Sequence, residues 1–302
     1  MKTTIHVFMK QTVIGFGELL WDMLPAGKQI GGAPGNFAFH AMQCGLDGYI
    51  VSAVGNDPLG DEILQVARER GLNCIVSRVD KPTGTVDIKL DSNGVPQYTI
   101  NEHVAWDYIP FTPQLQALAQ QADAVCFGSL AQRHDISRNT LHRFLSMMKK
   151  DTLKIFDVNL RQHFYDRSIL EDNLNVCNIL KLNDEEVAIL GRLFGYESTN
   201  REAISRQLLT DFSLKMVILT CGSECSYVFT PDGMSHIDTP KGKMADTVGA
   251  GDSFTATFCA CIMQGDPISK AHQAAVDVAA YVCTQNGAMP VWPAELRDTV
   301  SE

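Results

Sequence analysis

"ADTVGAGDSFTATF", residues 245–258, places two glycines and an aspartate at the start of an apolar helical pattern. Gly249 and Gly251 let the backbone turn tightly and leave its N–H groups uncovered. The helix that begins here has further N–H groups without partners in its first turn. Together these amides form a site for an anion, and they would stabilise a phosphoryl group as its charge shifts during transfer.

Asp252 directly follows these glycines, where its carboxylate could accept a proton from a substrate hydroxyl. A carboxylate in the first turn of a helix stays ionised at neutral pH, so we expect a weak base, which is sufficient for phosphoryl transfer. The alternative is that Asp252 is an ordinary helix cap and that the glycines form only a turn. The short Gly-x-Gly-Asp pattern does not choose between these interpretations.

A second glycine-rich helix start lies at residues 31–42, "GGAPGNFAFHAM". Asn36 could be the cap of this helix. Together with Asp22 in "GELLWDML", however, Asn36 places an amide and a carboxylate where they could hold the hydroxyls of a ligand. The sequence has no G-x-x-x-x-G-K-[ST] phosphate loop, and "GFGELL" lacks the third glycine of a dinucleotide fingerprint.

Composition restricts the class of protein. A chain of 302 residues with 45% hydrophobic content can bury the core of one main domain. A formal net charge of −10 argues against nucleic acid and anionic membranes as partners. The nine cysteines lack C-x-x-C pairs, which predicts free, mostly buried thiols in a reducing compartment. With no long apolar run and no signal-peptide pattern, we expect a cytoplasmic protein.

Strand-like apolar runs alternate with amphipathic helical patterns, which predicts an α/β fold with a parallel, doubly wound sheet. The alternation breaks at residues 84–100, where two alternating runs flank the turn sequence "DSNG". A two-stranded ribbon is marginal alone, so we expect it to join a small sheet. The second half predicts a strand "NILKLN", a helix "DEEVAILGRLF", a strand "KMVILT", a hairpin around "TPDG" and helices over about 250–264 and 267–284.

"GGAPGN" and "DTVGAGDSF" resemble the two signatures of the ribokinase-like carbohydrate kinases, the PfkB family, and "GGAP" is similar to the fructokinase branch. "NDEE", residues 183–186, matches the N-x-x-E motif of this family. The resemblance covers almost the whole chain. It implies one domain over 1–302, a three-layer α/β/α sandwich with a mainly parallel central sheet, and a small β-sheet lid formed from segments near 18–35 and 84–107.

The resemblance also implies roles for individual residues. Asp252 would be the catalytic base, and the amides of Gly249, Ala250 and Gly251 would form the anion hole. The sugar would be held by Asp22, Gly32 and Asn36, with Asp157, Asn159 and Arg161 of "DVNLR" as further candidates. The nucleotide would contact Asn183, Thr220, Gly222, Asn286 and Gly287. Glu186 and Asn183 would place Mg²⁺ through water, and Asp246 would help to bind a monovalent cation such as K⁺. The alternative for "DVNLR" is a strand end with a solvated arginine.

These observations predict an ATP-dependent sugar kinase that requires Mg²⁺, with fructose as the acceptor. We also expect a homodimer formed through the edges of the lid. The alternatives are a kinase for another ligand, such as 2-keto-3-deoxygluconate, ribose or a nucleoside, and a sugar-binding regulator without catalysis. A sugar acid would need a cation for its carboxylate, which Arg161 or Arg133 could supply.

The charge of the proposed lid favours a neutral acceptor. Between residues 84 and 107 only Lys89 and His103 can carry positive charge, against the carboxylates of Asp91, Glu102 and Asp107. Such a balance would repel a phosphorylated or carboxylated substrate. The side chains of Tyr98, Ile100 and Trp106 could contact a sugar ring or form the core of the lid.

Overall fold

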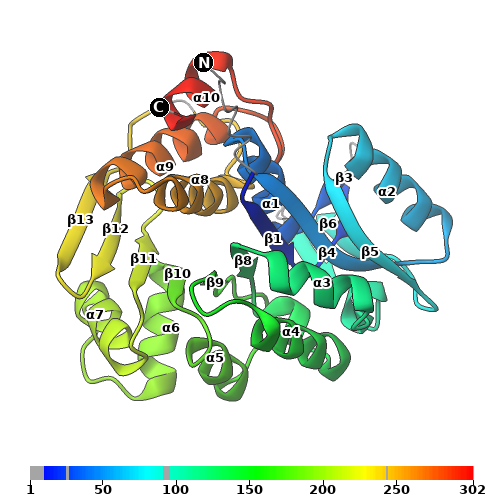
Figure 1. The fold of residues 1–302 in the computed structure, drawn as a ribbon, viewed down its shortest axis with the longest axis horizontal. Coiled ribbons are helices and arrows are strands. Elements are labelled where there is room, and N and C mark those ends of the chain that lie inside the picture. The colour runs from blue at the N-terminus through cyan, green and yellow to red at the C-terminus, as the bar shows by residue number, and fades with distance from the viewer. Residues whose placement is uncertain (1–9, 25–26, 91–95, 243, 302) are drawn as a thin grey trace, which may run out of the picture.

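The computed structural model describes residues 10–24, 27–90, 96–242 and 244–301. The hairpin turn expected at residues 91–94 lies outside the described residues. Within the described part the chain forms a nine-stranded sheet and a four-stranded sheet. Helices cover both faces of the larger one (Figure 1).

The larger sheet has the strand order β13-β12-β11-β10-β9-β8-β1-β4-β5. Its strands from β11 to β5 are parallel, and β12 and β13 add an antiparallel hairpin at one edge. The strands are β1 (Thr12–Phe16), β4 (Asp47–Gly55), β5 (Asn73–Val79), β8 (Ala124–Phe127), β9 (Leu153–Asp157), β10 (Ile179–Asn183), β11 (Met216–Thr220), β12 (Cys225–Thr230) and β13 (Gly233–Asp238). The predicted parallel sheet and the hairpin around "TPDG" are confirmed.

Successive residues of a strand point to opposite faces, and central strands such as β1 and β8 are buried on both, so they are mostly apolar, whereas the edge strands β5 and β13 are partly exposed. In β1, Val13 packs in one core cluster with Phe37 and Phe258, whereas its neighbour Ile14 packs in another with Phe144. The first cluster lies under α1 (Ala33–Gln43), α8 (Ala250–Gln264) and α9 (Ile268–Cys283). On the opposite face lie α3 (Pro113–Gln121), α4 (Asp135–Met147), α5 (Arg167–Leu174), α6 (Asp184–Phe194) and α7 (Arg201–Asp211).

Two helices complete the layers. α2 (Pro58–Glu69) packs beside β5, at the edge opposite the hairpin, and α10 (Ala294–Ser301) packs on α8 and α9 (Figure 1). The predicted helices over 184–194, 250–264 and 267–284 are therefore confirmed, the last beginning and ending one residue inside the expected range. The expected three-layer α/β/α sandwich is the fold that forms.

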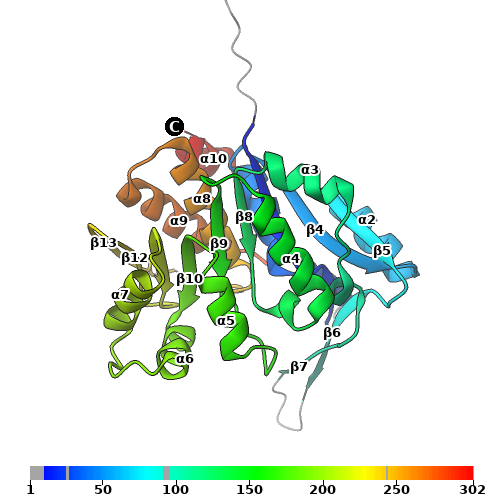
Figure 2. The same cartoon turned by 60° about the horizontal axis from the view of Figure 1, so that its bottom comes forward.

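The smaller sheet has the order β3-β2-β6-β7. It consists of β2 (Leu20–Leu24), β3 (Gly27–Gly31), β6 (Gly84–Leu90) and β7 (Pro96–Ile100). The apolar run that begins at Thr12 divides at Gly17, whose φ of 147° redirects the chain from β1 into β2. Because β2 continues from the carboxyl end of β1, the smaller sheet stands at the carboxyl edge of the larger one, and Figure 2 shows β6 and β7 projecting there.

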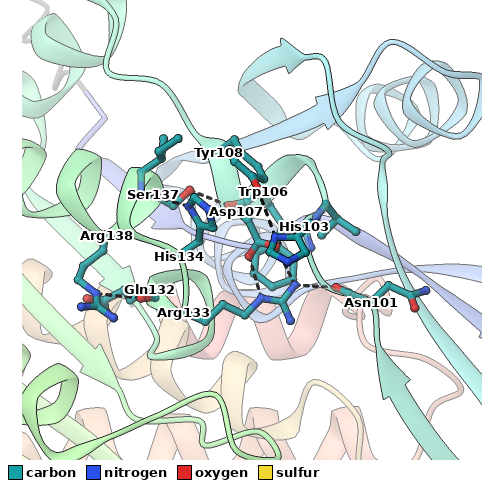
Figure 3. Close-up of polar contacts among 12 residues, drawn as sticks. Asn101, His103, Trp106, Asp107, Tyr108, Gln132, Arg133, His134, Ser137 and Arg138 are labelled. Carbon is teal, nitrogen blue, oxygen red and sulfur yellow. Dashed lines mark hydrogen bonds and ion pairs between the residues drawn. The ribbon is translucent and has the colours of Figure 1, made fainter.

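A buried ion pair lies at the base of the smaller sheet (Figure 3). Arg133 Nε and Nη2 donate to the two carboxylate oxygens of Asp107 at 2.8 and 2.9 Å, and Nη2 also donates to the backbone oxygen of Asn101. The guanidinium lies 4.0 Å from the ring centroid of Trp106 and 4.5 Å from that of Phe164. The contact fixes the segment after β7 to the loop after β8.

The expectation of free thiols is confirmed, since all nine cysteines are unpaired and seven of them are buried. Across the described ranges, none of the helices has the length and apolar character needed to cross a membrane.

We predict that Arg133→Ala lowers the free energy of unfolding by about 3–5 kcal/mol, because it leaves the carboxylate of Asp107 buried without its charge partner. The control is Lys270→Ala, which removes an ion pair with Asp266 in which the lysine side chain is 42% exposed. That change should cost less than about 1 kcal/mol. Urea unfolding of both variants would measure the difference, and equal losses would contradict a structural role for the buried pair.

Candidate active site

The first turns of α1 and α8 meet at the carboxyl edge of the larger sheet. Each helix begins at a glycine cap with a positive φ, which is 114° at Gly32 and 80° at Gly249, and neither cap supplies a side chain to the helix amides. A Cβ atom on Gly249 would lie 2.6 Å from the backbone oxygen of Ala288, so only glycine fits there. Among the described residues, the N–H groups of Gly249 and Gly251 at the start of α8 have no backbone partner, whereas that of Ala250 donates to Thr247 O at 3.3 Å. At α1, Pro34 has no N–H, and those of Gly35 and Asn36 donate to Gly32 O, so the open amides that the sequence predicts lie at α8.

Asp252 and Asn36 lie inside these first turns, and they contact each other. Asn36 Nδ2 donates to Asp252 Oδ2 at 2.7 Å, although the two residues are 216 positions apart. The interpretations of Asn36 and Asp252 as helix caps are therefore wrong, because Gly32 and Gly249 occupy the cap positions. The amide instead fixes the orientation of the carboxylate.

The pKa of Asp252 is raised to about 6, mainly by burial and next by the nearby charge of Asp157. The hydrogen bond from Asn36 and the positive charges of Lys181 and Arg161 act in the opposite direction. From its place in the first turn of a helix, Asp252 is expected to have a low pKa and to be a weak base. That expectation is wrong, because burial raises the pKa by more than the helix start lowers it. At pH 7 most of the carboxylate is ionised and it is basic enough to take a proton.

Lys181 lies below the glycine loop, and the sequence analysis does not single it out. Its Nζ is 3.1 Å from Asp157 Oδ1, and both side chains are at most 10% exposed. A Cβ atom on Gly251 would lie 3.0 Å from this Nζ. Burial alone would lower the pKa of Lys181, but the carboxylates of Asp157, Glu186 and Asp252 raise it, so the ammonium stays charged. The only feature of the sequence that could have indicated a buried role for Lys181 is its position inside the apolar run "ILKLN".

The "DVNLR" segment, residues 157–161, lies beside Asp252. Asp157 and Asn159 line a pocket together with Asp252, and Asn159 has a φ of 42°, which is uncommon for a residue other than glycine. Arg161 is exposed, yet its charge acts on the pKa of Asp252 and of Asp22. Asp22 is half-buried in β2, and burial raises its pKa. The structure thus gathers the residues expected on the sugar side at one edge of the two sheets.

Asn183 and Glu186 form a capping box at the start of α6. Asn183 Oδ1 accepts from the backbone N–H of Glu186, and Glu186 Oε2 accepts from that of Asn183, both at 2.8 Å. Glu186 Oε1 accepts from the N–H of Leu160 at 2.8 Å, which ties α6 to the "DVNLR" segment. Asn183 pairs in register with Thr220 at the carboxyl ends of β10 and β11.

The loop before α8 is tied to the loop after α9. Asp246 Oδ2 accepts from the N–H of Gly287 at 3.3 Å, and Oδ1 accepts from that of Val248 at 3.1 Å. Asn286 is exposed beside this contact, and Gly222 is exposed just beyond β11. The residues expected to bind the nucleotide therefore occupy strand ends and loops at the surface.

The contacts of Arg133 and Asp107 correct two expectations from the sequence, and the burial of Trp106 decides between the two alternatives left for it in favour of a core side chain. The charges of Arg133 and Asp107 neutralise each other, so Arg133 is not available for a substrate carboxylate and Asp107 adds no net negative charge to a lid (Figure 3). Trp106 is fully buried against Arg133 and cannot contact a sugar. Of the other two side chains considered for sugar contact, Tyr98 is 58% exposed, whereas Ile100 is buried.

Residues 4–295 match the pfkB family of carbohydrate kinases. A match over nearly the whole chain means that the chain belongs to this family.

Similar proteins include several sugar kinases. The chain is 27% identical over 300 residues to the ATP-dependent 6-phosphofructokinase of Thermoanaerobacterium thermosaccharolyticum, covering 93% of this chain and 90% of that one. It is 24% identical over 315 residues to fructokinase-1 of Oryza sativa subsp. japonica, covering 95% and 96%. The fructokinase of Xylella fastidiosa, solved with bound ATP, superposes with a TM-score of 0.82 at 21% identity, covering 97% and 98%.

We predict that Gly249→Ala destabilises the protein more than Gly265→Ala. Both glycines have a left-handed φ, 80° and 89°, which costs an alanine about 1–2 kcal/mol. A Cβ atom on Gly265 meets nothing within 4 Å, whereas one on Gly249 meets Ala288. The extra loss at Gly249 should be about 1–3 kcal/mol in denaturant unfolding. Equal losses would mean that the loop is not held tightly against Ala288.

Proposed function

We propose that the protein is an ATP-dependent sugar kinase and that its acceptor is fructose. The observation that carries this proposal is the Asn36–Asp252 hydrogen bond at the start of α8, because it holds a basic carboxylate directly beside open backbone amides. A base next to an anion hole is the pair of groups that phosphoryl transfer to a hydroxyl needs. A sugar-binding regulator without catalysis would need neither of them.

In the proposed reaction the acceptor hydroxyl gives its proton to Asp252 while its oxygen forms a bond to the γ-phosphorus, and ADP leaves. The amides of Gly249, Ala250 and Gly251 stabilise the charge on the phosphoryl oxygens, and the ammonium of Lys181 below them adds positive charge. The smaller sheet acts as a lid over the acceptor, so that the phosphoryl group reaches the sugar rather than water.

The nucleotide and its cation fit the outer part of the site. Among the described residues no three of the His, Cys, Asp or Glu side chains cluster as metal ligands. Mg²⁺ commonly keeps several waters and binds through substrate phosphates, so Glu186 and Asn183 suit a contact through water. Mg²⁺ would neutralise phosphate charge during transfer. The residues proposed to hold ATP are Asn183, Thr220, Gly222, Asn286 and Gly287. Asp246 would contribute to a K⁺ site.

The carboxyl groups of the pocket support a neutral acceptor. Glu18, Asp157 and Asp252 line it, and Asp22 is on the adjacent strand β2. Lys181 balances Asp157, and the exposed Arg161 acts on the other three carboxyl groups, so these still outnumber the cations. An acceptor with a negative charge at this position would be repelled. The "GGAP" form of the first signature and the similarity to fructokinases favour fructose within the neutral sugars. The alternative acceptor is a sugar acid whose carboxylate forms an ion pair with Arg161.

A homodimer through the smaller sheet is part of the proposal. Within the described residues, β3 and β7 are the edge strands of that sheet. Unpaired strand edges can pair with those of a second copy.

We predict that Asp252→Asn lowers kcat at least about a hundredfold and leaves the Kd for fructose within a few fold, because the variant loses the base but keeps the shape of the site. In the unchanged protein, kcat/KM should fall with decreasing pH below about 6, where Asp252 becomes protonated. The matched control is Asp61→Asn, a first-turn aspartate of α2 that is exposed. Near-normal turnover by Asp252→Asn would refute its role as the base.

We predict that fructose gives the highest kcat/KM in a panel with ribose, glucose, 2-keto-3-deoxygluconate, fructose 6-phosphate and adenosine. ADP release in a coupled assay would measure each rate. A phosphorylated or carboxylated acceptor with the highest value would refute the charge argument. A preference for ribose or adenosine would refute fructose and leave the chemistry of Asp252 standing.

A further inference from the structure

Glu18 is a carboxyl group of this site to which neither the sequence nor the proposed mechanism gives a role. It lies just after β1, where the chain turns toward β2, and its side chain packs beside Gly32, the cap of α1. A Cβ atom on Gly32 would lie 3.5 Å from Glu18 Cγ. The side chain is 4% exposed and lines the same pocket as Asp157, Asn159 and Asp252.

One oxygen of Glu18 has nothing to bind in the described structure. Oε2 is buried and has no hydrogen-bond partner among the described residues, and the same is true of Oδ1 of Asn36, the residue that orients Asp252. A buried carboxyl oxygen without a partner is costly, so such groups are uncommon in folded proteins. The carboxyl oxygen of Glu18 lies in the pocket that Asp252 also lines, and the amide oxygen belongs to Asn36, which contacts Asp252. A ligand with hydroxyl groups would give these atoms the partners that they lack.

Burial makes Glu18 a hydrogen-bond donor as well as an acceptor near neutral pH. Burial raises its pKa to about 7. The N–H groups of Glu18 and Ala33 and the positive charge of Arg161 oppose this rise, whereas the charge of Asp252 adds to it. A carboxyl group that is half protonated at pH 7 can donate to a sugar oxygen or accept from a sugar hydroxyl.

We propose that Glu18 is a second acceptor-binding carboxyl, whose Oε2 forms a hydrogen bond with the hydroxyl next to the one that Asp252 deprotonates. This inference rests on the proposed function and narrows its substrate class. The acceptor must carry two neighbouring oxygen functions within reach of Glu18 and Asp252. A simple alcohol can bind only Asp252, whereas a sugar with several hydroxyl groups can bind both Asp252 and Glu18.

The first test uses the protein without ligands and compares Glu18→Gln with the unchanged chain. A carboxyl whose pKa is higher in the folded than in the unfolded protein loses stability as the pH rises from about 4.5 toward 7. The uncharged glutamine side chain of the variant has no such loss. Glu18→Gln should therefore raise Tm by about 3–6 °C at pH 8 and have little effect at pH 4.5. Glu185→Gln, a change at an exposed residue of α6, is the control and should show no such pH dependence. A Glu18→Gln difference that is the same at both pH values would contradict a buried, unpartnered carboxyl.

The second test measures binding of the acceptor. Glu18→Ala should raise KM for D-fructose at least about tenfold with a smaller change in kcat, because the lost contact is to the bound sugar and not to the reacting oxygen. Glu18→Gln should keep a KM closer to that of the unchanged protein at pH 6, since glutamine retains a donor and an acceptor. A purely structural role would change Tm without this difference in KM between alanine and glutamine.

Deoxyfructose analogues locate the contact. In the unchanged protein, the analogue that lacks the hydroxyl bound by Glu18 should bind more weakly than fructose. In Glu18→Ala, the same analogue and fructose should bind with nearly equal affinity, because the contact is already lost. If every analogue loses the same affinity in both proteins, Glu18 does not bind the sugar and the inference is wrong.

If the unchanged protein phosphorylates fructose with KM unaffected by Glu18→Ala, this inference alone fails. If the unchanged protein phosphorylates no sugar of the panel, the proposed function fails and the inference fails with it.

Discussion

The hydrogen bond between Asn36 and Asp252 joins the two ends of the chain at the point where the chemistry is proposed to occur. Each partner lies in the first turn of a helix that a glycine begins, and those helices pack against each other on one face of the larger sheet. Both helices start at the carboxyl edge, so the amide of Asn36 in α1 lies beside the carboxylate of Asp252 and the open N–H groups of Gly249 and Gly251 in α8. The position of Asp252 therefore depends on the packing of α1 against α8, and not on either signature sequence alone.

Two sets of charged groups surround the hydrogen bond between Asn36 and Asp252. Below the glycine loop, the ammonium of Lys181 balances the carboxylate of Asp157, so a positive charge remains close to the amides without an unpaired ion in the core. Beside it, Glu18 and Asp252 are carboxyls whose pKa values burial raises to about 7 and about 6. Burial thus makes one group an effective base near neutral pH and leaves the other able to donate a hydrogen bond.

The sequence predicts the larger sheet, the helices after its strands and the glycine-rich starts of α1 and α8, because these follow from periodicity and from the conformations that glycine allows. It does not predict that Asn36 and Asp252 meet, since a contact across 216 positions is a consequence of packing. Arg133 and Trp106 show the same limit. Both look like ligand-binding side chains in the sequence, and tertiary structure places both in a buried contact at the base of the smaller sheet. The sequence does not indicate a role for Lys181, because a lysine in a strand usually points to solvent.

We propose that this site transfers a phosphoryl group from ATP to a sugar hydroxyl with Asp252 as the base. Phosphorus-31 NMR of the protein with ATP, Mg²⁺ and fructose tests it most directly, because the spectrum identifies the bond that forms. We predict that one new sugar phosphate ester appears at the same rate as ADP, and that Asp252→Asn slows both together. ADP accompanied by inorganic phosphate and no ester would rule out sugar kinase activity, and an unchanged rate of ester formation in Asp252→Asn would rule out Asp252 as the base.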